Sequence, residues 1–108
     1  MGRQPANDGA LGADGAMAPG TEEATLSRLR NLCPTVSVGT LTADMMNLGS
    51  ELESLARSGV GVVHIDVMDG CFCPQMTVGA SYVKGLRTSL LKDVHLMVQE
   101  PLAKLNAY

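Results

Sequence analysis

The sequence predicts an α/β fold in which a parallel sheet is built from successive strand–helix units. Two valine-containing apolar runs, residues 59–69 and 92–98, have the length and composition of buried strands. Apolar residues between positions 42 and 59 recur with the helical repeat instead of the strand repeat. Strands that alternate with helices at this spacing form βαβ units with right-handed crossovers.

Length and composition predict one small domain and exclude several classes of partner. The chain has 108 residues, of which 45% are hydrophobic and 18% charged, and its net charge is −3. Because tryptophan is absent, only 3% of residues are aromatic and the charge is negative, we expect no nucleic-acid partner. No apolar run approaches the about 20 residues that span a bilayer, and three cysteines give no disulfide framework. We therefore expect no membrane partner and a cytoplasmic location.

The N-terminal segment differs from the rest in composition. Residues 1–20 are dominated by Gly, Ala, Asp, Asn and Pro with no apolar period, so they cannot bury enough surface to offset the entropy of ordering. We predict a disordered Gly/Ala-rich tail over residues 1–27 and a folded part over residues 28–108. The leucines of a short predicted helix cross this boundary at Leu26, Leu29 and Leu32. This helix either packs on the base of the sheet or frays.

The first strand–helix unit is predicted from residues 35–59. Residues 35–41 form the strand, and residues 42–59 form the helix. The apolar positions of this helix are Met45, Leu48, Leu52 and Leu55. Thr42 or Asp44 can cap its start, and Gly59 can end it.

The later elements repeat the same arrangement. They are predicted in order as a strand over residues 59–69, a loop over 71–79, a helix over 80–89, a strand over 92–98 and a helix over 101–108. Val83 and Leu86 are expected to face the sheet from the second helix. Pro101 stands where a helix commonly begins.

Ionisable residues occupy one face of the second and third strands. Because alternate residues of a strand share a face, His64, Asp66 and Met68 project to one side of the second strand. The same rule places His95 and Met97 together on the third strand. Neighbouring parallel strands lie about 4.8 Å apart, so His64 and His95 at matching heights could share one metal ion with Asp66. The alternative is a pair of core histidines satisfied by hydrogen bonds.

Other reactive or charged side chains are predicted to have structural roles. Asp69, which precedes Gly70 at the end of a strand, is predicted to be a turn residue and not a second base. Cys71 and Cys73 lack the spacing of a zinc site and are predicted to be loop residues. Three cations are predicted to be solvated and to complement the helix dipole. They are Lys84, Arg87 and Lys92.

Three phrases of the sequence together resemble the ribulose-phosphate 3-epimerase family: LTADMMNLG, VHIDVMDGCFCPQMTVG and DVHLMV. Their order and separation are similar to those of the first three strands of the family. The resemblance implies a partial (β/α)8 TIM barrel, about the first three βα units, that runs from about Cys33 to Tyr108. A complete barrel needs about 250 residues.

The resemblance also implies roles for individual residues. The implied ligands of a divalent metal ion, with Zn, Mn, Fe and Co as candidates, are His64, Asp66 and His95. Asp66 is also the implied catalytic acid/base, and Met68 and Met97 correspond to methionines of the substrate pocket. Gly39 belongs to the same pocket and stands where the family usually has a serine, in a phrase like S-x-L-S-A-D. A second aspartate on a late strand, the fourth ligand of the family, is expected beyond Tyr108.

The activity that the resemblance implies is that of an isomerase of the pentose phosphate pathway, which interconverts pentulose 5-phosphates at carbon 3 by metal-assisted proton transfer. Such a reaction needs two opposed acid/base groups, so we expect the 108-residue chain alone to be inactive. Its partners would be the pentulose phosphate and, in a homo-oligomer, further copies of the chain. The alternatives are a non-catalytic metal-binding or self-associating remnant, because an open sheet edge favours pairing, and an incomplete gene-model fragment.

Overall fold

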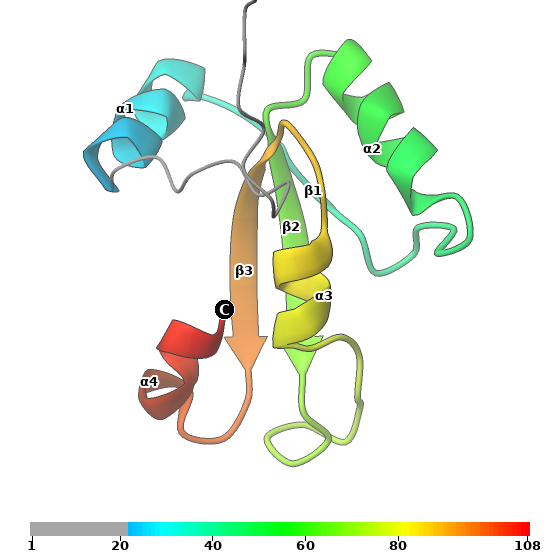
Figure 1. Cartoon of the computed structure of the whole chain (residues 1–108), viewed down its shortest axis with the longest axis vertical. Coiled ribbons are helices and arrows are strands. Elements are labelled where there is room, and N and C mark those ends of the chain that lie inside the picture. The colour runs from blue at the N-terminus through cyan, green and yellow to red at the C-terminus, as the bar shows by residue number, and fades with distance from the viewer. Residues whose placement is uncertain (1–21) are drawn as a thin grey trace, which may run out of the picture.

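The computed structural model describes residues 22–108, and the disorder predicted for residues 1–20 lies outside this range. Helix α1 (Glu22–Leu32) begins before the predicted domain boundary at residue 28. The elements that follow it are β1 (Ser37–Gly39), α2 (Leu48–Arg57), β2 (Val62–Met68), α3 (Ala80–Gly85), β3 (Leu91–Met97), α4 (Pro101–Lys104) and the 3-10 helix η1 (Leu105–Ala107). Figure 1 shows their arrangement.

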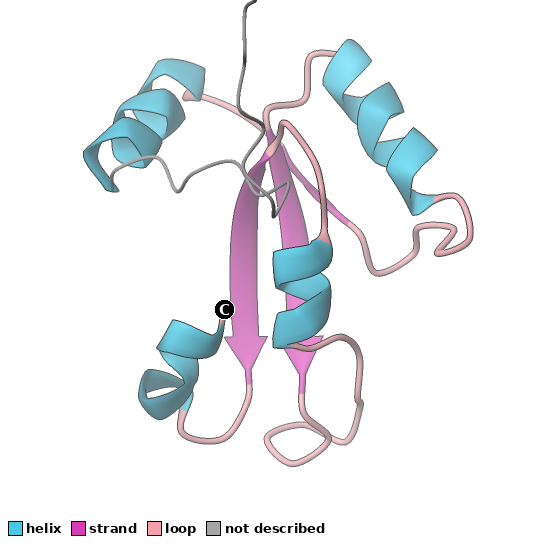
Figure 2. Cartoon of the chain, viewed as in Figure 1, coloured by secondary structure: helices cyan, strands magenta, loops and turns pink. Residues whose placement is uncertain are grey.

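The three strands form one parallel sheet in the order β1-β2-β3. Helix α2 connects β1 to β2, and α3 connects β2 to β3, which is the βαβ arrangement that the sequence predicts. The α/β fold class is therefore confirmed, and an open three-stranded sheet of this kind is consistent with part of a (β/α)8 barrel. Strands β2 and β3 point toward the same end of the molecule, where the loops to α3 and α4 begin (Figure 2).

The hydrophobic core lies on the face of the sheet that α2 and α3 cover. Val63, Ile65 and Val67 of β2 are 0%, 0% and 1% exposed. Leu52 of α2 packs in one cluster with Val63, and Val83 of α3 packs in another with Ile65 and Val67. Because side chains alternate along a strand, the residues between these three point to the opposite face. We call this opposite face, which is the one that would line a barrel, the inner face.

Helix α2 begins at Leu48, later than the predicted start at residue 42. The carboxylate of Asp44 accepts hydrogen bonds from the backbone N–H of Met46 (3.0 Å) and the side-chain amide of Asn47 (2.6 Å), so it closes a turn before the helix. The prediction that Thr42 or Asp44 caps α2 is therefore wrong. Short polar side chains compete with the helix for backbone groups in this way.

The end of α2 follows the prediction. Gly59 has a φ of 86°, in the left-handed region that favours glycine. Its N–H donates to the carbonyl of Ala56, and the N–H of Val60 donates to that of Leu55, both at 3.1 Å. This pair of bonds is a Schellman motif, which satisfies the last carbonyls of the helix.

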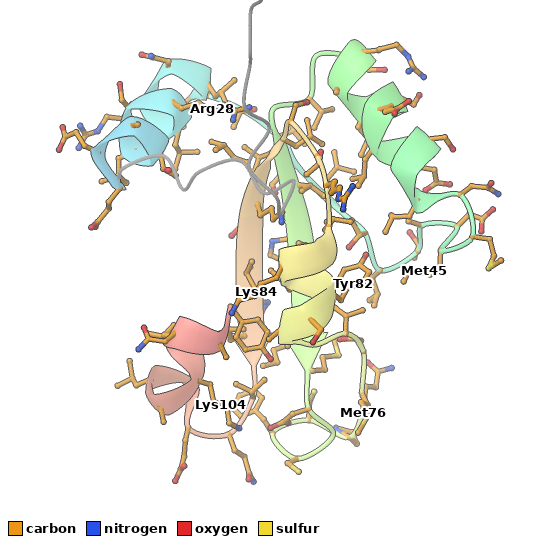
Figure 3. The ribbon with its side chains drawn as sticks, viewed as in Figure 1. Arg28, Met45, Met76, Tyr82, Lys84 and Lys104 are labelled. Atoms are coloured by element: carbon orange, nitrogen blue, oxygen red, sulfur yellow. The ribbon has the colours of Figure 1, made fainter. Side chains whose placement is uncertain are left out.

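Helix α1 packs at the end of the sheet where the strands begin. The guanidinium of Arg28 donates to the carbonyl of Ser89, just before β3 (Figure 3). A Cβ atom at Gly61, just before β2, would lie 2.8 Å from the side chain of Leu32. The C-terminal part of α1 thus contacts the base of the sheet, whereas Leu26 and Leu29, two of the three leucines predicted to pack there, are 43% and 38% exposed.

Lys92 is exposed, as predicted, and it also makes a structural contact. Its ammonium donates to the carbonyl of Val83 in the last turn of α3 at 2.6 Å, and partial burial lowers the pKa of the amine. It still complements the negative end of the helix dipole. Lys84 and Arg87 are exposed, as predicted.

Candidate metal centre

The inner face of β2 and β3 brings the predicted ligands together. In the register of the two strands, Asp66 is the direct partner of His95, and His64 is the direct partner of Asp93. These four side chains therefore lie in two adjacent rows across the strands, so His64 and His95 are offset by one row and do not lie at the predicted matching heights. The side chains of His64, Asp66 and His95 are 29%, 20% and 55% exposed, so the cluster is accessible from solvent.

Asp66 is the centre of this cluster. Its Oδ1 atom lies 3.1 Å from Nε2 of His64 and 3.1 Å from Nδ1 of His95. The two imidazole rings are tilted by 44°, with their centroids 5.8 Å apart. Within residues 22–108, His64, Asp66 and His95 are the one group of three or more such side chains whose donor atoms could reach a shared ion, and these atoms all lie within 4.8 Å of one another.

The spacing of the two imidazole nitrogens from Asp66 is compatible with a transition-metal ion. Bonds from zinc to histidine nitrogen and carboxylate oxygen are about 2.0–2.2 Å long, so two ligands of one ion lie about 3–3.5 Å apart. Both distances of Asp66 fall in this range. Two nitrogens and one oxygen are also the donor types that zinc and iron accept. Both imidazoles are hydrogen-bonded to carboxylates, as in the alternative prediction, but they are accessible to solvent and do not lie in the core. Their role as metal ligands stays a prediction.

His64 is held between two carboxylates. Its Nδ1 atom lies 2.7 Å from Oδ2 of Asp93, and its Nε2 faces Asp66. The hydrogen bond to Asp93 is the largest influence on the pKa of His64 and raises it, with Asp66 adding to the rise and burial opposing it. The two carboxylates thus favour positive charge at this position, whether on the imidazole or on a bound cation.

The residues predicted for the substrate pocket occupy the same inner face. Met68 and Met97 are direct partners, at the carboxyl ends of β2 and β3. Gly39 pairs with His64 from the side of β1, and a Cβ atom at Gly39 would meet nothing within 4 Å. Their contact with a substrate stays a prediction.

Two polar residues that contact the cluster were not predicted from the sequence. Asp93 is one of them, although its spacing of two from His95 already placed it on the inner face. The other is Thr77, whose hydroxyl donates to the carbonyl of Asp66 (2.6 Å) and accepts from the N–H of Met68 (3.0 Å). No local pattern distinguished Thr77 from the other residues of its loop.

A cavity of about 240 Å³ adjoins Asp66. Met45, predicted to face the core from α2, instead lines this cavity and is 54% exposed. Figure 3 shows it close to Tyr82 of α3, which lines the cavity too. The full lining is Thr40, Leu41, Met45, Asp66, Thr77, Val78 and Tyr82.

Asp69 is a turn residue, as predicted. Its Oδ1 accepts from the backbone N–H groups of Cys71 and Phe72, and its Oδ2 accepts from that of Gln99, each at 2.9 Å. These bonds, the one to Gln99 first, lower the pKa of Asp69 to about 2. The carboxylate thereby ties the loop after β2 to the loop after β3.

The two cysteines of this loop are also as predicted. Cys71 and Cys73 are free thiols within the loop that follows β2. In the part of the chain that the structure describes, neither belongs to a group of side chains that could hold a metal ion.

No helix within residues 22–108 combines the length and the apolar character that crossing a bilayer requires.

The family model and the similar proteins that match this chain carry the same enzyme name. Residues 35–108 match the model described as the ribulose-phosphate 3 epimerase family. Ribulose-phosphate 3-epimerase from Bacillus subtilis is 44% identical over 68 residues, which cover 61% of this chain and 31% of the relative. The cytoplasmic isoform of this enzyme from Oryza sativa subsp. japonica is 41% identical over 75 residues, which cover 62% and 33%. The chloroplastic ribulose-5-phosphate-3-epimerase from Arabidopsis thaliana is 43% identical over 68 residues, which cover 61% and 24%. The chain thus spans about a quarter to a third of the length of these relatives.

Proposed function

Because the chain belongs to the ribulose-phosphate 3-epimerase family, we propose that it carries the metal-binding part of an isomerase that inverts carbon 3 of a pentulose 5-phosphate. The names of the relatives suggest the substrate class. The observation that carries the proposal is the convergence of two imidazole nitrogens on one carboxylate oxygen, both at 3.1 Å.

Three side chains would hold a divalent cation, with Zn, Mn, Fe and Co as the candidates. The donor atoms are Nε2 of His64, Nδ1 of His95 and Oδ1 of Asp66. A bound cation would supply Lewis-acid polarisation of the substrate carbonyl and the neighbouring hydroxyl. Three ligands leave open positions at which substrate oxygens can bind.

Asp66 would act as acid/base on one side of the substrate. As a carboxylate it accepts the proton from carbon 3, and a second acid on the opposite side returns a proton to invert the centre. In the described part of the chain, Asp66 is the one carboxylate within hydrogen-bonding distance of both imidazoles. We therefore expect little or no turnover from the 108-residue chain alone.

The remaining inner-face residues would shape the pocket. Met68 and Met97 would form an adaptable apolar wall beside the substrate, and Gly39 would leave room for it. Met68 and Met97 lie one row closer to the carboxyl ends of the strands than Asp66 and His95. Ligands of α/β barrels bind at these ends.

We place the protein in the cytoplasm, as in the relative from rice.

A second candidate function is metal binding without turnover, in a chain that associates with copies of itself. The order β1-β2-β3 leaves one edge of β1 and one edge of β3 without a strand partner among residues 22–108. Unpaired edges of this kind favour association with another chain. Light scattering during size-exclusion chromatography measures the mass in solution, and a mass of one chain at all concentrations would exclude this candidate.

The metal site is tested by thermal unfolding of the purified chain with and without Zn²⁺ or Mn²⁺. A ligand that binds only the folded state raises Tm. At a hundredfold excess over Kd, it adds about 2.7 kcal/mol to the free energy of unfolding. His64→Ala and His95→Ala should abolish this rise, whereas Lys84→Ala, at an exposed position of α3, should keep it. An equal metal response in the histidine variants would refute the assignment.

Turnover is tested separately with ribulose 5-phosphate, in a coupled assay that detects xylulose 5-phosphate. We expect none above background from the chain alone. Clear turnover that disappears in Asp66→Asn would support the role of Asp66 and refute the expectation that a further acid/base is required. Turnover that persists in Asp66→Asn would refute the role of Asp66.

A further inference from the structure

We infer that Asp93 is a positioning residue, whose carboxylate holds the imidazole of His64 so that its Nε2 lone pair faces the metal position. This inference deepens the proposed function and rests on it for the identity of the ligand. It starts from one contact, the 2.7 Å distance between Nδ1 of His64 and Oδ2 of Asp93.

The contact is built into the sheet. His64 and Asp93 are direct partners in the parallel register of β2 and β3, so the backbones of two strands fix their separation. An ionised carboxylate can only accept hydrogen bonds. A neutral His64 that bonds to Asp93 must therefore carry its proton on Nδ1, which leaves Nε2 as the nitrogen with a free lone pair.

The two imidazoles of the cluster are held differently. His64 contacts a carboxylate at each nitrogen, with Asp93 at Nδ1 and Asp66 at Nε2. For His95, the contact with Asp66 is the one side-chain hydrogen bond that it makes within residues 22–108, and its side chain is 55% exposed. His64 is thus the ligand whose ring is oriented in advance, and Asp93 is the residue that orients it.

This orientation has a chemical consequence. A carboxylate that accepts the second N–H of a metal-binding histidine selects the tautomer and increases the basicity of the ligand nitrogen. Loss of such a partner typically weakens metal binding about 10–100-fold. Asp93 also carries negative charge near the site, so its orienting role must be separated from simple attraction of a cation.

Two substitutions make this separation. Asp93→Ala removes both the charge and the acceptor, whereas Asp93→Asn removes the charge but retains an oxygen that can accept from Nδ1. The side chain of Asp93 is 53% exposed, so neither change opens a buried cavity. Glu53→Gln on the exposed surface of α2 is the matched control for the loss of one charge.

The readouts are the tautomer of His64 and the affinity for Zn²⁺ in the 108-residue chain. The ¹⁵N chemical shifts of the ring report the tautomer in the metal-free chain, at a pH where the imidazoles are neutral. We expect mainly protonated Nδ1 in the wild type and in Asp93→Asn, because the contact with Asp93 (2.7 Å) is shorter than that with Asp66 (3.1 Å). In Asp93→Ala, Asp66 is the carboxylate that remains, so the proton should shift toward Nε2. By titration calorimetry, Zn²⁺ binding should weaken about 10–100-fold in Asp93→Ala, less in Asp93→Asn and not in Glu53→Gln.

Failure of the inference and failure of the proposed function give different results. If the tautomer of His64 in Asp93→Ala equals that of the wild type, Asp93 does not orient the ring. Equal losses of affinity in Asp93→Asn and Asp93→Ala, with the tautomer retained in Asp93→Asn, would assign the effect to charge alone and also overturn the inference. If Zn²⁺ does not bind the wild type, or binds His64→Ala equally well, the proposed metal site fails, while the tautomer of the metal-free chain still decides the role of Asp93.

Discussion

Ile65 separates the two ligands of β2, and its replacement tests whether the two faces of the strand have independent roles. Its side chain is fully buried and belongs to the cluster with Val67, Val83 and Val98. Ile65→Val removes one buried methylene, at about 0.8 kcal/mol of transfer free energy, and the cavity that remains brings the cost to about 1–1.5 kcal/mol. Ile65→Ala removes three carbons and should cost about 3–4 kcal/mol.

Thermal unfolding followed by circular dichroism measures these costs. In a domain of this size 1 kcal/mol shifts Tm by about 4–8 °C, so Ile65→Val should unfold at least about 4 °C below the wild type. Ile65→Ala removes a large part of the about 5–15 kcal/mol that stabilises a typical domain. Met46→Ala is the control, because Met46 is 90% exposed and its truncation should cost less than about 0.5 kcal/mol.

The metal response completes this test. Since Ile65 points away from His64 and Asp66, saturating Zn²⁺ should raise the Tm of Ile65→Val as much as that of the wild type. If Ile65→Val and Met46→Ala lower Tm equally, the assignment of the core face is wrong. If Ile65→Val loses the response to Zn²⁺, the two faces are not independent.

Three further predictions concern the loops and caps. Asp69→Asn should reduce the loss of stability in acid. The pKa of Asp69 is about 2 in the fold against an ordinary 3.8, so its stabilisation is present above about pH 4 and is lost as pH falls toward 2. In urea unfolding across this range, the free energy of unfolding should decline less in the variant than in the wild type. Gly59→Ala should lower the free energy of unfolding by about 1–2 kcal/mol, since Gly59 has a φ of 86°. Gly49→Ala inside α2 should instead raise it by up to about 1 kcal/mol. If chemical denaturation shows that both substitutions change stability in the same direction, this explanation is wrong. Thr77→Val should cost about 1–3 kcal/mol, because it removes the acceptor for one backbone N–H and the donor to one carbonyl, and it should destabilise the chain more than Thr77→Ser, which keeps the hydroxyl.

Alternation along the strands explains why the faces were predictable. The strand repeat of two fixes the side of the sheet from sequence alone, so the buried set around Ile65 and the inner-face set around Asp66 both followed. The prediction that β2 is wholly buried was wrong for the ionisable residues, because no further element covers the inner face among residues 22–108.

Helix boundaries and contacts between strands were less predictable. The apolar period of α2 extends back to Met45, but hydrogen bonds of Asp44 close a turn there and delay the helix to Leu48. Propensity and period describe one segment, whereas side chains that bond to nearby backbone groups set its ends. The contact of Asp93 with His64 depends on the register between two strands, which no single segment encodes.

Thr77 and Asp69 close the loop after β2 at its base. The hydroxyl of Thr77 bonds to β2 on both sides of Val67, and the N–H of Gly70 bonds to the carbonyl of Gln75 at 2.9 Å. Insertions or deletions at the tip, residues 73–74, beyond the two N–H groups that Asp69 binds, would therefore leave the carboxylate of Asp66 in place. The tip can accumulate length variation during evolution, and peptide epitopes can be grafted there, without a change in the geometry of the cluster.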